Sequence, residues 1–250
     1  DDPPEVPPPV TPAILPGTFL SVPLGLGSSL SFVWVEALNI WFGKYEITNS
    51  QYQHYDRRHS SRTLEGHDLN GPQQPVVFVS WHEATAYCNW LNRTFSDRIP
   101  GQCEFRLPVA SEWEFVAACG STRPYPWGDD WPPLYGNHSD ATARENLSQW
   151  NGIRGYKDGY AVTCPVDHSG MNEWGVYGLA GNVWEWVIDR YGRYEGQASV
   201  DPTGPQSGLT RVMRGGGFVN PARHLRSARR FNHDESLRYS AIGARLVRIR

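Results

Sequence analysis

The sequence predicts an α+β fold with little regular secondary structure. Short strand-like segments come first, two helical segments follow, and a long irregular stretch precedes a final group of short strands. With 39% apolar and 13% aromatic residues among 250, the chain can bury a substantial core. Its eleven tryptophans, several of them in irregular segments, indicate that large rings fill the space between loops.

The first 16 residues differ in composition from everything that follows. The opening DDPPEVPPPVTP is acidic and rich in proline, which is typical of a stiff, solvated tether. Such tethers often follow a removed signal or lipid-anchor sequence, so we expect an extracytoplasmic protein that is periplasmic, secreted or tethered to a surface. An arbitrary starting point of the sequence is the alternative. No repeat or linker follows, and residues 17–250 are therefore predicted to form a single domain.

The predicted strands and helices come mainly from the first half of the chain. Residues 17–48 alternate apolar with small or polar residues between glycines, which predicts two or three short strands. Residues 48–58 are predicted to form a short helix with Thr48 or Asn49 at its N-terminus, and residues 61–74 a polar surface loop.

Two further helices have clear signals. Ser80 and Glu83 form an S-x-x-E capping box before apolar residues at helical spacing. Residues 109–118 form the second helix, which should end at Gly120 because glycine tolerates a left-handed C-cap. Residues 125–174 show little periodicity, and such a long irregular stretch needs a clamp.

Charge and motifs exclude several classes of function. A net charge of −3 offers no general attraction to nucleic acid, and no run approaches the roughly 20 apolar residues of a transmembrane segment. The chain lacks a G-x-S-x-G elbow, a phosphate-binding loop and a dinucleotide fingerprint, which disfavours the commoner hydrolases, kinases and dehydrogenases. The four cysteines match no zinc spacing, and we expect at most one disulfide.

Six blocks of sequence resemble one enzyme family. They read FGKYEITNSQY, QPVVFVSWHEATAYCNWLN, FRLPVASEWEFVAA, YPWGDDW, DGYAVTCPVDHSGMNEWGVYGLAGNVWEW, and RVMRGGGF with IGARLVR. In this order they resemble the formylglycine-generating enzyme (sulfatase-modifying factor) superfamily from about Phe42 to the C-terminus. The resemblance implies a C-type-lectin-like fold of the formylglycine-generating-enzyme type.

The same resemblance implies structural calcium. A first set of ligands would be Asn137, His138, Asp158 and Tyr160. A second set would be Gly178, Gly181, Val183 and Glu185, although family members more often have Asn or Asp where Gly178 stands. Oxygen ligands from two irregular segments suit calcium and would clamp them. The alternative is that Asp158 belongs to a simple turn and Asn137 to a cap.

The family's chemistry depends on two cysteines between the glycine run and the final IGxR, which bind copper(I) and oxidise a substrate cysteine. Cys164 is the last cysteine of this chain, and GGGFVNPARHLRSARR occupies the corresponding place. Thiolates are the soft ligands that copper(I) requires. We therefore expect neither copper nor formylglycine-generating activity, and we assign no catalytic residue.

The segment that lost the thiols mixes apolar, aromatic and polar residues without periodicity, which favours a binding surface on a rigid scaffold. The predicted ligand-binding residues are Trp184, Val219, Asn220, His224, Phe231, Asn232, His233 and Tyr239. We expect a protein or small-molecule ligand. Three alternatives remain: a divergent maturation enzyme like the periplasmic relatives in siderophore maturation, a retroelement-diversified variable protein that uses this lectin-like domain, and a structural subunit of an assembly.

Overall fold

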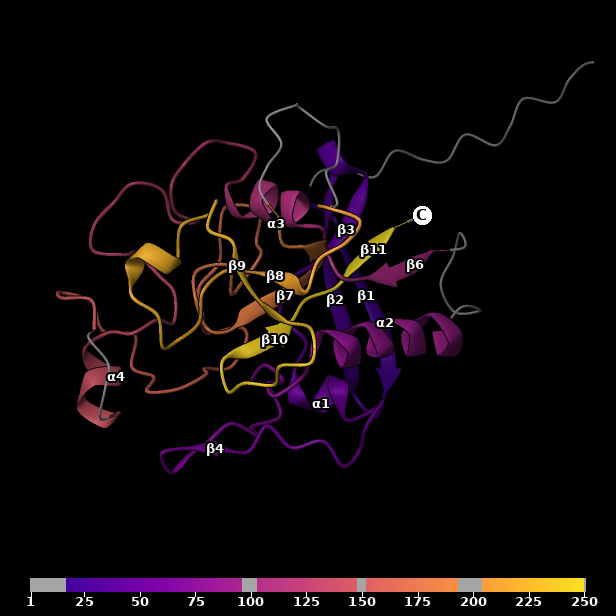
Figure 1. Ribbon diagram of the computed structural model, residues 1–250, viewed down its shortest axis with the longest axis horizontal. Coiled ribbons are helices and arrows are strands. Elements are labelled where there is room, and N and C mark those ends of the chain that lie inside the picture. The colour runs from indigo at the N-terminus through magenta and orange to yellow at the C-terminus, as the bar shows by residue number, and fades with distance from the viewer. Residues whose placement is uncertain (1–16, 96–102, 148–151, 193–203, 250) are drawn as a thin grey trace, which may run out of the picture.

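The computed structural model describes residues 17–95, 103–147, 152–192 and 204–249. The predicted tether, residues 1–16, lies outside them. Two curved sheets and a few short helices confirm the α+β class (Figure 1).

The first sheet has five strands in the order β1-β2-β3-β11-β6. Their bounds are β1 Phe19–Gly25, β2 Ser28–Val35, β3 Ile40–Gly43, β6 Glu104–Arg106 and β11 Val247–Ile249. Strands β1 to β3 form an antiparallel meander, as residues 17–48 predict, and a one-turn helix η1 (Glu36–Leu38) connects the last two. Strand β11 pairs with both β3 and β6, so the C-terminal strand lies inside this sheet and connects β6 to it.

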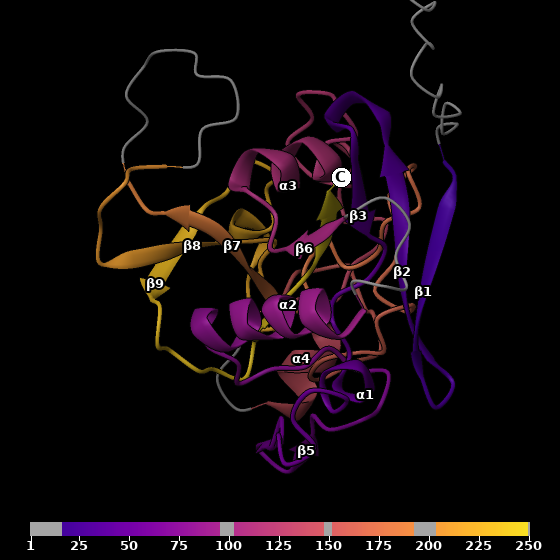
Figure 2. The same ribbon diagram turned by 90° about the vertical axis from the view of Figure 1, so that its right-hand side faces the viewer.

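The second sheet has four strands in the order β10-β7-β8-β9. Their bounds are β7 Trp184–Arg190, β8 Thr210–Arg214, β9 Phe231–Asp234 and β10 Ile242–Ala244. Strand β9 is an edge strand, and its residues are exposed or half-buried. Figure 2 shows β9 and β1 on opposite sides of the molecule.

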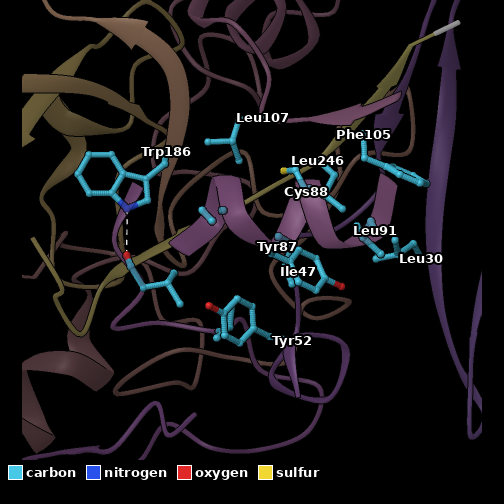
Figure 3. Packing of buried hydrophobic residues seen from close by; sticks show 14 of the residues in the cluster. Leu30, Ile47, Tyr52, Tyr87, Cys88, Leu91, Phe105, Leu107, Trp186 and Leu246 are labelled. Carbon is cyan, nitrogen blue, oxygen red and sulfur yellow. Dashed lines mark hydrogen bonds between the residues drawn. The ribbon is translucent and has the colours of Figure 1, made fainter. Parts of the chain in front are cut away.

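Helix α2 (Trp81–Phe95) begins at the predicted capping box. The Glu83 carboxylate accepts hydrogen bonds from the Ser80 backbone N–H and hydroxyl, both at 2.8 Å, and Ser80 Oγ accepts one from the Glu83 N–H. Its apolar face packs into the main core, where Tyr87 and Leu91 are completely buried (Figure 3). Nearby, Trp186 Nε1 donates to the Val79 carbonyl at 3.0 Å and so joins β7 to this layer.

Helix α3 (Ala110–Ala117) covers a second core cluster between the two sheets, with Trp113 at its centre. The chain then turns through Cys119 and Gly120, both at positive φ, which confirms the predicted C-terminus. Helix α1 (Asn49–Tyr52) is shorter than residues 48–58, and its N-cap is Thr48.

The remaining elements are small. They are the hairpin strands β4 Thr63–Leu64 and β5 His67–Asp68, helix α4 Ala141–Asn146 and the one-turn helix η3 Ala222–His224. The hairpin lies within the predicted surface loop. Among the described residues, no helix is long and apolar enough to cross a membrane.

Candidate functional site

The glycine run after β8 folds back on the residues that follow it. Asn220 Oδ1 accepts a hydrogen bond from the Gly217 N–H at 2.9 Å, and the Asn220 carbonyl accepts one from Ser139. Gly216 lies so close to Leu225 that a Cβ would come within 2.7 Å of its Cδ2, at a φ of +79°. The Asn220 side chain therefore closes a structural turn.

Three predicted residues form an aromatic cluster beside this turn. Trp184 at the start of β7, His224 at the end of η3 and Phe231 at the start of β9 have ring centroids between 5.4 and 6.4 Å apart. Trp184 is mostly covered, whereas Phe231 is 39% exposed. Burial and the positive charges of Arg223 and Arg229 lower the pKa of His224, so its ring is neutral at pH 7.

Of the other predicted ligand-binding residues, three are exposed or half-buried and one is buried. Asn232 and His233 follow Phe231 on β9, and Tyr239 is 44% exposed in the loop before β10. Val219 was predicted to contact the ligand, but it is only 5% exposed. It packs in a core cluster with Phe218 and Val183 instead of lying on the surface. We call the exposed or half-buried residues His224, Phe231, Asn232, His233 and Tyr239, together with the mostly covered Trp184, the C-terminal face.

Arginines hold the scaffold under this face. Arg214 on β8 is completely buried and donates to Glu114 Oε2 at 2.6 Å and to the carbonyls of Ser227 and Arg229 at 2.9 and 2.6 Å. Charge-assisted bonds of this kind fix loop geometry. Arg214 therefore ties the loop between η3 and β9 to α3.

Glu185, predicted to bind calcium in the second set, has protein partners instead. Its two oxygens accept hydrogen bonds from Arg245 Nε and Nη2 at 2.6 to 3.1 Å, and Oε2 also accepts one from Trp113 Nε1 at 2.6 Å. Glu185 and Arg245 are both fully buried. The cation beside Glu185 is thus a guanidinium.

A second buried carboxylate lies beside this pair. Burial raises the pKa of Glu46 to about 7, although Arg245 and a hydrogen bond from Asn182 oppose the shift. Gly178 packs so closely on Glu46 that a Cβ would lie 2.3 Å from its oxygens. A side-chain ligand at position 178 would collide with Glu46. Calcium at the second set stays a prediction, for which this geometry gives no support.

The first calcium set fits the ion better. Asn137 Oδ1 is buried and has no hydrogen-bond partner among the described residues. Burial raises the pKa of Asp158 to about 7, and the neighbouring Asp140 carboxylate adds to the shift. His138 is buried and neutral because desolvation lowers its pKa to about 4. The unsatisfied Asn137 oxygen and the adjacent Asp158 and Asp140 carboxylates are oxygen ligands of the kind that a hard cation such as calcium prefers.

Two buried carboxylates of these sites, Asp140 and Glu46, were not predicted from the sequence. Asp140 is completely buried, and its carboxylate accepts hydrogen bonds from Ala143 N–H at 2.9 Å and Asp158 N–H at 2.6 Å. An aspartate before the helix-forming ATAREN is an N-cap signal that would have identified it. Nothing near Glu46 in the sequence indicates that it lies beside Glu185.

The four cysteines are free thiols. Cys88 and Cys164 are buried, Cys103 accepts a hydrogen bond from Arg248, and Cys119 contacts Arg123 and Glu173. Within the described residues, no group of three His, Cys, Asp or Glu side chains could hold a metal ion on its own. A calcium site at the first set would therefore also need amide and carbonyl oxygens.

Solved structures define the class of the fold. The chain resembles Treponema denticola variable protein 1 at a TM-score of 0.72 and 21% identity, with 92% of this chain and 98% of the other covered. It resembles PvdO from Pseudomonas aeruginosa at a TM-score of 0.69 and 23% identity, with 95% and 100% covered. The fold is thus of the C-type-lectin-like, formylglycine-generating-enzyme type.

The family follows from the sequence comparison. Residues 15–250 match the sulfatase-modifying factor enzyme 1-like domain, and the chain belongs to that family. A formylglycine-generating enzyme of Streptomyces coelicolor is 35% identical over 68% of this chain and 49% of its own length. The inactive C-alpha-formylglycine-generating enzyme 2 of Mus musculus is 36% identical over 59% and 39%. The chain spans about half the length of such relatives, or less.

Proposed function

We propose that this protein is a binding domain without formylglycine-generating activity and that it holds a protein ligand on its C-terminal face. The observation that carries the proposal is the combination of an edge strand and exposed rings. Among the described residues, strand β9 pairs only with β8; Phe231 on β9 exposes 39% of its surface, and Tyr239, in the loop that leads from β9 to β10, exposes 44%. Exposed aromatics and free strand edges are features that proteins use to bind polypeptide partners.

The loss of the thiols supports the absence of oxidase chemistry. Asn220 follows the glycine run, and it is engaged in closing a turn. The nearest cysteine in sequence, Cys164, is buried on another segment, where burial raises its pKa well above the ordinary value. A buried, protonated thiol is a poor copper(I) ligand.

An extracytoplasmic location belongs to the same proposal. It is supported by the acidic, proline-rich composition of residues 1–16. Cell fractionation of the source organism tests it directly, and recovery of the protein with cytoplasmic markers would contradict it.

The binding proposal is tested with a peptide library displayed against the immobilised full chain. Peptides selected by the unmodified protein should bind Phe231→Ser and Tyr239→Ser at least about tenfold more weakly, because central aromatic contacts dominate such interfaces. Leu26→Ser is the matched control, since Leu26 is 94% exposed in the turn between β1 and β2 of the other sheet. Equal loss in all three variants, or no selected peptide, would contradict the proposal.

The absence of oxidase activity is tested separately. The copper(I)-loaded full chain is incubated with oxygen and a cysteine peptide, and the mass of the peptide is measured. We expect no conversion to formylglycine. Conversion that depends on copper would show that the family's chemistry survives without the cysteine pair.

A further inference from the structure

A groove of about 770 Å³ lies far from the C-terminal face. Its walls come from β1, β2, η1, α3 and the loop between residues 171 and 177. Strands β1 and β2 lie on the side of the molecule opposite β9 (Figure 2). The groove is therefore independent of the proposed protein-binding face, and its volume is within the range of small-molecule sites.

The walls of the groove are largely apolar and aromatic. Phe115 and Trp174 pack against each other at 5.6 Å between ring centroids, and Val35 of β2 lines the groove in the same apolar cluster. Phe19 and Met171 are 60% and 52% exposed. Large apolar side chains gathered in one concave surface mark a site that gains free energy when it is covered.

One cation lies in this apolar environment. Lys44 follows β3, is half-buried, and has its Nζ over the rings of Phe19, Tyr45 and Tyr177 at 4.8, 5.3 and 5.6 Å. No carboxylate of the described residues forms an ion pair with it. The three rings stabilise the ammonium group through their π faces but offer no carboxylate acceptor. Lys157, the other lysine of the chain, forms an ordinary exposed pair with Glu145.

The acidic residues of the groove do not offset Lys44. Glu173 forms an ion pair with Arg123 at 2.7 Å, and the hydrogen bond from Arg123 lowers the pKa of Glu173 to about 2. Glu36 on η1 is exposed and forms no ion pair within the described part of the chain. A water-exposed carboxylate needs no partner, whereas an ammonium group held among rings is stabilised by an anion.

We propose that the groove binds an amphipathic carboxylate. The hydrocarbon or aromatic part of the ligand covers Val35, Phe115 and Trp174, and its carboxylate accepts charge-assisted hydrogen bonds from Lys44 Nζ. A cationic amphiphile is disfavoured because Lys44 repels it. A neutral amphiphile keeps the apolar contacts and loses the ion pair.

Binding is measured on the full chain by isothermal titration calorimetry with sodium dodecanoate below its micelle concentration. Dodecanol and dodecyltrimethylammonium are the neutral and cationic probes of equal chain length. We expect saturable binding of dodecanoate, with binding at least about tenfold weaker for the other two probes. The indole of Trp174 provides a second signal, since its fluorescence should change at the same ligand concentrations.

The role of Lys44 is tested with matched variants. Lys44→Met keeps the aliphatic stem over the rings and should weaken dodecanoate binding about tenfold without affecting dodecanol, while Lys44→Arg should restore most of the affinity. Lys157→Met removes the other lysine and should change nothing. Met171→Trp should weaken the binding of both dodecanoate and dodecanol, because the larger side chain fills part of the groove. The proposal is overturned by the absence of saturable binding, by equal affinity for the three probes, or by equal effects of the two lysine-to-methionine variants.

Discussion

Arg245 joins four parts of the chain through one side chain. Its guanidinium donates to the Gly43 carbonyl at 2.9 Å, to the Tyr177 carbonyl at 2.6 Å and to Glu185 on β7, which also binds Trp113 of α3. The Tyr177 carbonyl is part-buried and the other groups are removed from water, so most of these bonds are formed in a medium of low dielectric constant. The desolvation of both charges leaves a buried pair of this kind with little net contribution to stability, but removing one partner is strongly destabilising because the other charge stays buried without compensation.

The substitution Glu185→Gln tests how much folding stability is lost when this ion pair is broken. The substitution preserves the shape of the side chain but leaves Arg245 buried without its main counter-charge. We expect the free energy of unfolding in urea to fall by about 3–5 kcal/mol. Glu145→Gln is the control, because the exposed pair with Lys157 should contribute no more than about 1 kcal/mol. Similar losses for the two variants would mean that Glu185 is not held as an ion pair.

His59 predicts a dependence of stability on pH. Its Nε2 donates to the Val77 carbonyl at 3.0 Å, and burial lowers its pKa despite nearby Asp56 and Glu83. The unfolded chain, with an ordinary histidine pKa near 6.5, therefore binds the proton more readily than the folded one. The protonation of His59 therefore does not lower the free energy of unfolding above about pH 6.5. As the pH falls from there towards the folded pKa, the free energy of unfolding decreases by at most about 1.4 kcal/mol per pH unit.

His59→Gln keeps a donor for Val77 and removes the titration. Urea unfolding between pH 7 and pH 5 should show a smaller loss of stability than in the unmodified protein. An unaltered slope in His59→Gln would assign the pH dependence to other groups.

At the scale of elements, side chains replace regular structure in the irregular region. The Asp158 carboxylate accepts hydrogen bonds from the backbone N–H groups of His138 and Tyr160 at 3.1 and 2.8 Å. The Asp140 carboxylate accepts one from the first turn of α4 and one from the Asp158 N–H, and so connects the two segments. The Ile153 N–H donates to the Ser139 carbonyl at 2.7 Å. These bonds form the clamp expected for residues 125–174, and calcium would strengthen it.

Calcium binding at Asn137, His138, Asp158 and Tyr160 is a prediction with a thermal readout. A ligand bound only by the folded state stabilises it, so calcium at about 100 times its dissociation constant should raise Tm by about 5–10 °C over the chelated protein. Asp158→Asn should abolish most of that difference. Asp68→Asn, at an exposed carboxylate, should retain it. If a chelator leaves Tm of the unmodified protein unchanged, these oxygens hold no calcium.

At the scale of the whole molecule, the two ends of the described chain are interleaved. Strand β11 lies between β3 and β6, and β10 runs parallel to β7. Gly43 permits the closest approach, since a Cβ there would lie 2.7 Å from the Leu246 carbonyl oxygen, which accepts the Gly43 N–H. Non-local pairing and burial, without disulfides among the described residues, hold the fold together.

Stability should therefore be independent of reducing agents. We expect Tm to change by less than about 1 °C on adding dithiothreitol, because no covalent cross-link constrains the unfolded chain. A thiol reagent should count four cysteines in urea. In the folded protein it should not reach Cys88, whose pKa burial raises to about 12. A fall of several degrees with reductant, or fewer than four thiols in urea, would reveal a disulfide.

Local signals and tertiary contacts decided different features. Ser80 with Glu83 and the left-handed turn at Gly120 were predicted because caps and C-termini depend on neighbouring residues. The hairpin of β4 and β5 was not, since two-residue strands have no periodicity. Val219 was predicted to lie on the surface and is buried, because periodicity is lost in an irregular loop and only packing defines its inward direction.

The sequence by itself determined the α+β class, the two main helices, the family and the absence of any cysteine after Cys164, because composition, local caps and motif order are properties of the chain alone. Tertiary structure decided which charges meet. Glu185 finds Arg245 sixty residues away, and Lys44 lies among rings from β1 and from the loop containing Tyr177. Such pairs depend on how distant segments cross in space, and local sequence carries no record of that crossing.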